Sequence, residues 1–236
     1  MEVPPERLAS WIIAFAQRHG GAASVTPDAD GAAVTFTAAD GATAECHPPF
    51  PPLSTHPAVG EARGAGEARG AGEVRGAAEA LAAHAAADRT VGVLLVRLGG
   101  YAAGVFAGSP PRLVSSKTGS RLVHGRSAAG GWSQHRFARR RENQAATALH
   151  AAADAAAEVF GPYRPDGLDA VVLGGDKRSA AGLRGDARLI PYLDRAATRF
   201  LTVPDPRLAV LRDIPRAFLA TRIRLTEPES DGPAPC

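Results

Sequence analysis

The chain has 236 residues, with 27 Lys+Arg against 24 Asp+Glu, and 45% of its residues are hydrophobic. This length can bury one or two cores, but no apolar run reaches the roughly 18 residues that a membrane-spanning helix needs, and two cysteines are too few for a disulfide framework. The first residues lack the pattern of a signal peptide, and no Cys/His cluster has metal-site spacing. We therefore expect a cytoplasmic protein that uses neither a metal nor another cofactor.

The first part of the sequence predicts a small unit, residues 1–58, made of a helix and a β-hairpin. Apolar residues recur at i, i+3, i+4 and i+7 within 5–18, which indicates an amphipathic helix. Two short strands follow at 33–38 and 42–47, and the Asp-Gly dipeptide at 40–41 between them is typical of a hairpin turn.

A six-residue repeat comes next, reading GEARGA, GEARGA, GEVRGA over 60–77. Glycine at every sixth residue disfavours a stable helix, and three short repeats are too few for a solenoid. We therefore expect a low-complexity linker over 59–78, followed by a helix over 79–88.

Residues 79–226 predict a second unit, a mixed α/β sheet with helices packed against it. A buried strand leads into a β-meander, and a long helix runs from about Gln134 to Phe160. The expected strands are 90–98, 101–108, 112–117, 120–126, 167–175 and 199–205, before a closing helix and strand. We expect 227–236 to be a disordered tail.

Positive charge is concentrated in one segment of this unit. From Arg89 to Arg141 there are ten Lys and Arg residues and no Asp or Glu, which leaves 17 basic and 24 acidic residues elsewhere. Such asymmetry indicates one anionic partner that binds one face. The alternative is a solvated basic segment without a partner.

The densest part of the segment is 116–143, SKTGSRLVHGRSAAGGWSQHRFARRREN. Gly130 and Gly131 free the backbone from side-chain bulk, arginines bind phosphates, and Gln134 follows the glycines at the end of the loop. This combination indicates a polar loop that enters a site enclosed by RNA, where the glutamine positions a water molecule beside a reactive carbonyl.

The order of HGR, a Gly-Gly loop with a nearby glutamine, and RFARRRE at 136–142 resembles the GGQ middle domain of eukaryotic and archaeal class-I release factors. Here Trp132 follows the glycines directly, and Gln134 comes two positions later. This spacing is closer to the bacterial branch of the Vms-like release factors, and the likeness is strongest over 113–160. The resemblance implies a ribonuclease-H-like fold for the second unit.

The same resemblance implies a peptidyl-tRNA hydrolase that frees nascent chains from stalled large ribosomal subunits. Its catalytic residues would be Gly130, Gly131 and Gln134, and its partners the large subunit, peptidyl-tRNA and rRNA. A glutamine amide does not titrate near neutral pH, so it would orient water rather than act as a general base. We expect a monomer with no membrane partner.

Eight residues are candidates for RNA contact. On a helix, Arg136, Arg139 and Arg140 share one face and Arg141 lies on another, so they cannot all contact RNA at once. Trp132 either stacks on a base or is buried in the core. The full set is Lys117, Arg121, Arg126, Trp132, Arg136, Arg139, Arg140 and Arg141.

Two other functions stay open. One is a ribosome- or RNA-binding rescue factor without catalysis, against which the presence of Gln134 counts. The other is a metal-dependent nuclease, although Glu142, Asp169 and Asp176 do not form an obvious ligand set. The run GGDKRSAAG at 174–182 lacks the glycine spacing of known phosphate loops, so we interpret it as a turn.

Overall fold

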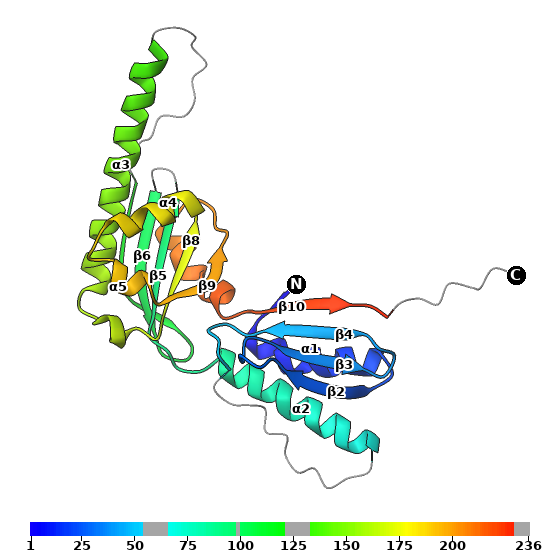
Figure 1. Cartoon of the computed structure of the whole chain (residues 1–236). Helices are drawn as coiled ribbons and strands as arrows, with labels where there is room; N and C mark the ends of the chain where they lie inside the picture. The colour runs from blue at the N-terminus through cyan, green and yellow to red at the C-terminus, as the bar shows by residue number, and fades with distance from the viewer. Residues whose placement is uncertain (54–65, 98–99, 121–132, 229–236) are drawn as a thin grey trace, which may run out of the picture. The chain divides into compact units, whose positions relative to one another are not determined.

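The computed structural model describes residues 1–53, 66–97, 100–120 and 133–228, with the backbone alone at 22–23, 66–69 and 133–142 (Figure 1). The chain divides into two compact units. Residues 1–87 and those from 219 onward form the first unit, and residues 88–218 form the second. The first unit is therefore built from two separate stretches of the sequence.

The first unit contains a five-stranded sheet in the order β1-β10-β4-β3-β2, and every strand is antiparallel to its neighbours. Two helices pack on this sheet, and their apolar side chains share one core with it. The elements are β1 Glu2–Val3, α1 Pro5–Arg18, β2 Ala22–Pro27, β3 Val34–Ala38, β4 Thr43–His47, α2 Gly66–Ala85 and β10 Thr221–Thr226.

The helix and hairpin expected near the start of the chain are confirmed. Helix α1 buries Leu8, Ile12 and Phe15, which belong to the apolar face expected from their spacing. Strands β3 and β4 pair antiparallel and alternate buried and partly buried residues. Their turn contains Gly41 with φ of 88°, a conformation that favours glycine. Strands β1 and β2 were not expected.

Helix α2 replaces most of the linker expected at 59–78. Gly66–Ala85 is a single helix although glycine recurs in its first half. Val74 and Leu81, seven residues apart, are buried in the core of the first unit. A Cβ added to Gly72 would meet no atom within 4 Å, so that glycine lies on the open side. Burial of the apolar stripe offsets the ~1 kcal/mol that each glycine costs a helix relative to alanine.

Strand β10 corrects the boundary expected at residue 226. Residues 222–226 pair with 47–43 of β4, so the last strand belongs to the first unit and not to the second. The pairing joins segments about 180 residues apart in the sequence. Local patterns such as the alternation at 221–226 indicate a strand but not its neighbour.

The second unit confirms the expected mixed sheet with helices. Its strand order is β7-β6-β5-β8-β9. Strand β6 is antiparallel to both of its neighbours, β5 and β7, whereas β8 is parallel to both β5 and β9. This order fits the ribonuclease-H-like sheet that the resemblance implied. The strands are β5 Val91–Arg97, β6 Gly100–Ala107, β7 Arg112–Ser120, β8 Ala170–Gly175 and β9 Ala196–Leu201.

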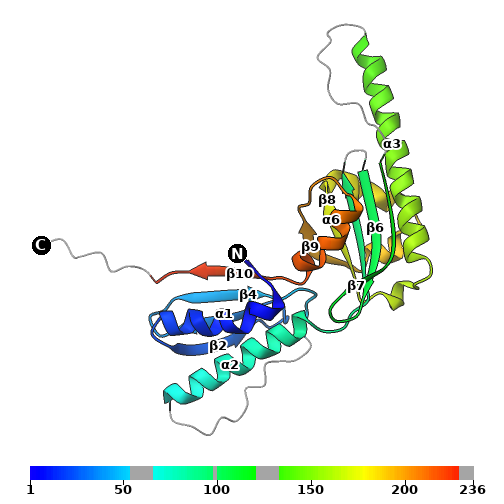
Figure 2. The ribbon, with the colours of Figure 1, turned by 180° about the vertical axis from the view of Figure 1, so that it is seen from behind.

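Helices cover both faces of this sheet, as Figures 1 and 2 show for α3 to α5 on one face and α6 on the other. This explains why β5 is buried at every residue from Val91 to Val96. The helices are α3 Ser133–Phe160, α4 Lys177–Gly182, α5 Ile190–Leu193, α6 Leu208–Asp213 and α7 Pro215–Phe218, with short 3₁₀ turns at Pro165–Gly167 and Leu183–Gly185.

The break expected between the strands 112–117 and 120–126 is wrong, because β7 continues through 118–119 to Ser120. Gly119 pairs in register with Tyr101 of β6. A Cβ on Gly119 would meet the phenol ring of Tyr101, so the glycine gives room to a cross-strand aromatic side chain instead of forming a turn. The strand expected at 120–126 lies almost entirely outside the described residues.

Candidate functional site

The candidate site is organised by the long helix α3, which extends well beyond the end of the sheet (Figures 1 and 2). Its 28 residues span about 42 Å. Residues 148–160 contribute seven buried side chains to the second unit, whereas none of the side chains at 143–147 is buried. We call 133–147 the arm and 148–160 the base of the helix.

The base packs through small side chains. Ala152, Ala155 and Ala156 are almost fully buried, and Phe160 closes the lower end against Tyr192, with 5.6 Å between the ring centroids. Alanines let the helix lie close to the sheet. The base is therefore fixed in place by packing along its length.

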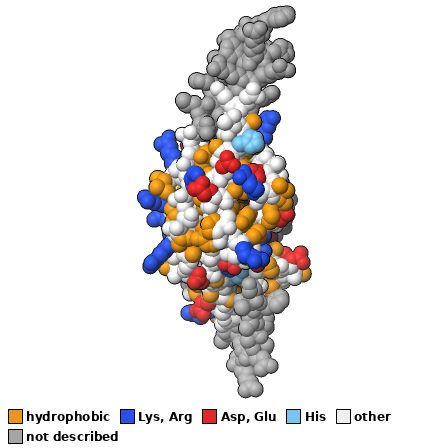
Figure 3. Space-filling view, turned by 90° about the vertical axis from the view of Figure 1, so that its left-hand side faces the viewer, with side chains coloured by type: hydrophobic (Ala, Val, Ile, Leu, Met, Phe, Trp, Pro, Cys, Tyr) orange, Lys and Arg blue, Asp and Glu red, His pale blue; other side chains and the backbone are white. Residues whose placement is uncertain are grey.

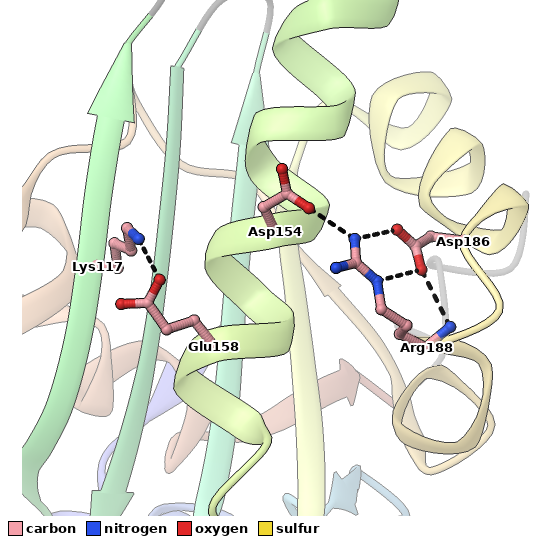
Figure 4. Close-up of polar contacts among 5 residues, drawn as sticks. All are labelled: Lys117, Asp154, Glu158, Asp186 and Arg188. Carbon is pink, nitrogen blue, oxygen red and sulfur yellow. Dashed lines mark hydrogen bonds and ion pairs between the residues drawn. The ribbon is translucent and has the colours of Figure 1, made fainter.

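Two ion pairs hold the base from either side (Figure 4). Lys117 of β7 is paired with Glu158 on one side. On the other, Nη2 of Arg188 donates to Asp154 Oδ1 at 2.7 Å and to Asp186 Oδ2 at 2.6 Å. Arg188 thus ties the helix to the loop that follows the second 3₁₀ turn. Asp154 lies in the middle of the base and Glu158 near its end, so both pairs hold the packed part of the helix.

Three of the groups in these contacts, Asp186, Arg188 and Lys117, have shifted pKa values. The hydrogen bond from Arg188 lowers the pKa of Asp186 to about 2, and the same contact raises the pKa of Arg188. The hydrogen bond to Glu158 likewise raises the pKa of Lys117. These contacts therefore favour the charged forms of Asp186, Arg188 and Lys117.

Five of the expected site residues lie in the arm. Gln134 is the second residue of α3, which begins one residue before the expected start, so the glutamine at the end of the loop lies in the first helical turn. It lies 14 residues before Ala148, about 21 Å along the helix axis. Arg136, Arg139, Arg140 and Arg141 follow within the next two turns as backbone, and the structure does not describe their side chains.

The remaining expected residues divide into two groups. Lys117 is described and forms the ion pair with Glu158, which gives it a partner other than RNA. The others lie outside the described residues, and their proposed roles stay predictions: Arg121, Arg126, Gly130, Gly131 and Trp132.

Sequence reasoning considered 174–182 as a phosphate-binding run but interpreted it as a turn, and so did not identify a basic cluster at the carboxyl ends of β5 and β8. Arg97 ends β5, and Lys177 and Arg178 open α4 directly after β8. The turn expected over 174–182 is thus the end of a strand followed by a short helix. Ligands of α/β folds often bind where parallel strands end, and that rule could have indicated these residues in the sequence.

Two of the acids named for the nuclease alternative, Asp169 and Asp176, do not converge, and the side chain of Glu142 lies outside the described part of the chain. Asp169 accepts a hydrogen bond from the N–H of Thr90 at 2.7 Å, just before β8, whereas Asp176 follows β8 and caps α4. The two are roughly 20 Å apart along the strand. Within the described ranges, no group of three or more His, Cys, Asp and Glu residues could hold a metal ion. The structure therefore offers the nuclease alternative no ligand set among its described residues.

None of the described helices combines the length and apolar character required to cross a bilayer. The most polar of the long helices is α3 itself, whose first half carries the arginine cluster.

Comparison with known proteins relates the second unit to a family. The model of the Actinobacteria/chloroflexi VLRF1 release factor family matches residues 89–224. This range covers more than half of the chain and includes the whole mixed sheet, the long helix and the basic cluster. No curated protein matches the chain.

Proposed function

Since the chain belongs to the Actinobacteria/chloroflexi VLRF1 release factor family, we propose that it hydrolyses the ester of peptidyl-tRNA and releases nascent chains from stalled large ribosomal subunits. The observation that carries the proposal is the position of Gln134 in the first turn of a helix that projects from a packed base. Such a helix can present one amide group to a site enclosed by RNA.

The chemistry requires a placed water and stabilisation of an oxyanion. The amide of Gln134 can accept a hydrogen bond from water and donate one to oxygen. An α-helix leaves its first four N–H groups without intrahelical acceptors, and Gln134 supplies one of them. A developing oxyanion near this helix start would meet free donors and the positive end of the helix dipole.

The expected contribution of these groups is large enough to matter. One oxyanion donor contributes about 3–4 kcal/mol in other acyl-transfer sites, and orientation of the reacting groups adds several kcal/mol. Because a glutamine does not take up the proton, the RNA around the ester would handle it.

The arginines of the arm would bind RNA phosphates around the same site. Arg136, Arg139, Arg140 and Arg141 follow Gln134 within two helical turns, so contacts to phosphates would fix the depth to which the glutamine enters. Glu142 directly follows Arg141 and is the first acidic residue of this stretch, so the four arginines have a single neighbouring carboxylate in sequence.

The decisive experiment measures release of a labelled nascent chain from stalled large subunits. Gln134→Ala should slow release by about 100-fold or more while binding to the subunit changes less than twofold. Gln144→Ala is the matched control, because this glutamine lies on the same helix ten residues later and is only partly buried. Equal release by both variants would refute the catalytic role of Gln134, whereas binding without release by the wild-type chain would favour a rescue factor without catalysis.

A further inference from the structure

The carboxyl end of the mixed sheet places three cations close together. β5 and β8 run parallel, with Val96 opposite Gly175, and the N–H of Asp176 donates to the carbonyl of Val96 at 2.7 Å. Arg97 therefore lies next to the start of α4, where Lys177 and Arg178 are exposed. The pKa of Asp176 is lowered mainly by hydrogen bonds from Ser179 and, to a smaller extent, by the charges of Arg178 and Arg97. This agrees with the proximity of both arginines to Asp176.

The backbone holds this cluster in a defined geometry. Gly175 has φ of 104°, and a Cβ there would collide with the carbonyl of Val96. The close approach of β8 to β5 at this point therefore requires glycine. Nη1 of Arg97 donates to the carbonyl of Val203 at 2.9 Å, which orients the guanidinium. The backbone of the cluster and the guanidinium of Arg97 are therefore held in place, whereas the side chains of Lys177 and Arg178 are exposed.

The balance of charge at the cluster is positive. Asp176 is the carboxylate next to it, and its Oδ1 accepts hydrogen bonds from the N–H and the hydroxyl of Ser179 at 2.7 and 2.8 Å. Lys177 and Arg178 form no ion pair among the described residues. Three cations and one carboxylate leave two positive charges, in contrast to Arg188, whose guanidinium is shared by two carboxylates.

A pocket opens beside the cluster, at the point where the arm joins the base of α3. Its polar lining comes from Arg97 and Ser179, and its apolar wall comes from Val96, Ala145, Ala148 and Leu149. The pocket has room for only about one water molecule, so a nucleic-acid unit would lie across its mouth, with the charged phosphate at the polar end and the less polar sugar against the apolar wall. We call this the arm-base pocket.

We propose that the arm-base pocket and the cations around it bind one ribose-phosphate unit of single-stranded RNA, as a second contact besides the arm. This inference rests on the proposed function, because it assumes that RNA surrounds the arm. The phosphate lies against Arg97, Lys177 and Arg178, and the ribose lies against the alanine wall. The contact fixes RNA at the base of the helix whose far end carries Gln134.

The test uses the full chain and a fluorescent single-stranded RNA, with affinity measured by anisotropy over a range of salt. Removing both charges in Lys177→Gln/Arg178→Gln should weaken binding about 25-fold near 0.1 M salt and reduce the slope of log affinity against log salt by about 1.4. The matched control is Arg212→Gln/Arg216→Gln, two exposed arginines of α6 and α7 without an ion pair among the described residues. Equal affinities and slopes for the two double variants would overturn the proposal.

A second pair of variants tests the pocket without changing charge. Ala145→Leu fills the pocket and should weaken RNA binding severalfold while the salt slope stays the same, whereas Ala146→Leu, at an exposed neighbouring position, should have no effect. If both leucine variants bind RNA alike, the pocket is not a ribose site. Competition by an acidic peptide of equal charge, as effective as RNA, would also overturn the assignment.

Release assays separate this inference from the proposed function. Gln134→Ala should keep full RNA affinity. If the wild-type chain releases no nascent chain but the double variant of Lys177 and Arg178 still loses RNA affinity and salt slope relative to its control, the RNA site stands and the hydrolase proposal fails. If the wild type releases chains and the double variant binds as its control does, the RNA site alone fails.

Discussion

Helix α3 differs between its arm and its base in burial, partners and charge. The base buries a row of alanines and is held by two ion pairs, whereas no side chain at 143–147 of the arm is buried. The arm begins with four arginines and a glutamine within nine residues, 133–141. Because arm and base form one continuous helix, the packing of the base sets the direction of the arm. The comparison can be tested by changing one half at a time.

The largest effect should come from breaking the continuity between the halves. Ala146→Pro removes a helical hydrogen bond and kinks the helix, and it falls at an exposed position just before the base. Because misplacement of a catalytic group by about 1 Å can cost 100-fold, release should fall at least that far. The thermal midpoint of the protein should change little, since calorimetry reports mainly the packed base. Ala146→Leu should release normally, and unchanged release by the proline variant would show that the direction of the arm is unimportant.

The next prediction compares how a substitution in the base and one in the arm change the free energy of unfolding. Ala156 is fully buried in the base, so Ala156→Leu overpacks the core and should lower the free energy of unfolding by about 1–3 kcal/mol. Ala146→Leu makes the same chemical change on the arm and should stay within about 0.5 kcal/mol. Urea unfolding followed by circular dichroism measures both. Similar losses for the two variants would mean that the arm is packed as tightly as the base.

A smaller effect decides the role of Lys117, which was expected to bind RNA but is paired with Glu158. If the lysine contacts a phosphate, Lys117→Gln should weaken RNA binding by about fivefold near 0.1 M salt, and Glu158→Gln should leave it unchanged or tighten it. If the lysine only holds the helix base, both variants should change RNA affinity to the same small extent. Anisotropy measurements on the two single variants distinguish these outcomes.

The smallest effect concerns acid stability of the base. The hydrogen bond from Arg188 lowers the pKa of Asp186 to about 2, below its usual 3.8. The folded state therefore favours the carboxylate, so this contribution is complete above about pH 4 and is lost as the pH falls through about 2. Asp186→Asn should make the urea midpoint less dependent on pH across that window. A pH dependence identical to that of the wild type would show that the contact with Arg188 does not persist in solution.

Local patterns predicted those elements well whose buried residues follow a regular spacing or a continuous apolar run in the sequence. The periodicity at 5–18 predicted α1 with its observed bounds, and the apolar run at 90–98 predicted β5. The linker predicted where α2 begins was wrong. The glycines of this segment disfavour a helix, but the sequence does not show that Val74 and Leu81 are buried in the core of the first unit. The prediction was also wrong at Gly119, whose partner Tyr101 is defined only by strand pairing.

The candidate site was predictable in part for the same reason. The arginines, Gln134 and the long helix follow from local sequence, and the observed helix starts within one residue of the expected position. The projection of the arm could not be predicted, because it depends on where burial begins at Ala148. The arm-base pocket joins α3, β5 and α4, and no spacing in the sequence shows that these elements meet.

The position of β10 has a consequence for biosynthesis. Residues 1–87 emerge first, yet their sheet lacks the strand between β1 and β4 until residues 221–226 have been made. The intervening unit, 88–218, contains all of its own strands and can collapse earlier during translation. A nascent chain halted before residue 219 would therefore carry a folded second unit beside an incomplete first sheet, with the backbone edge of β4 open to incorrect pairing.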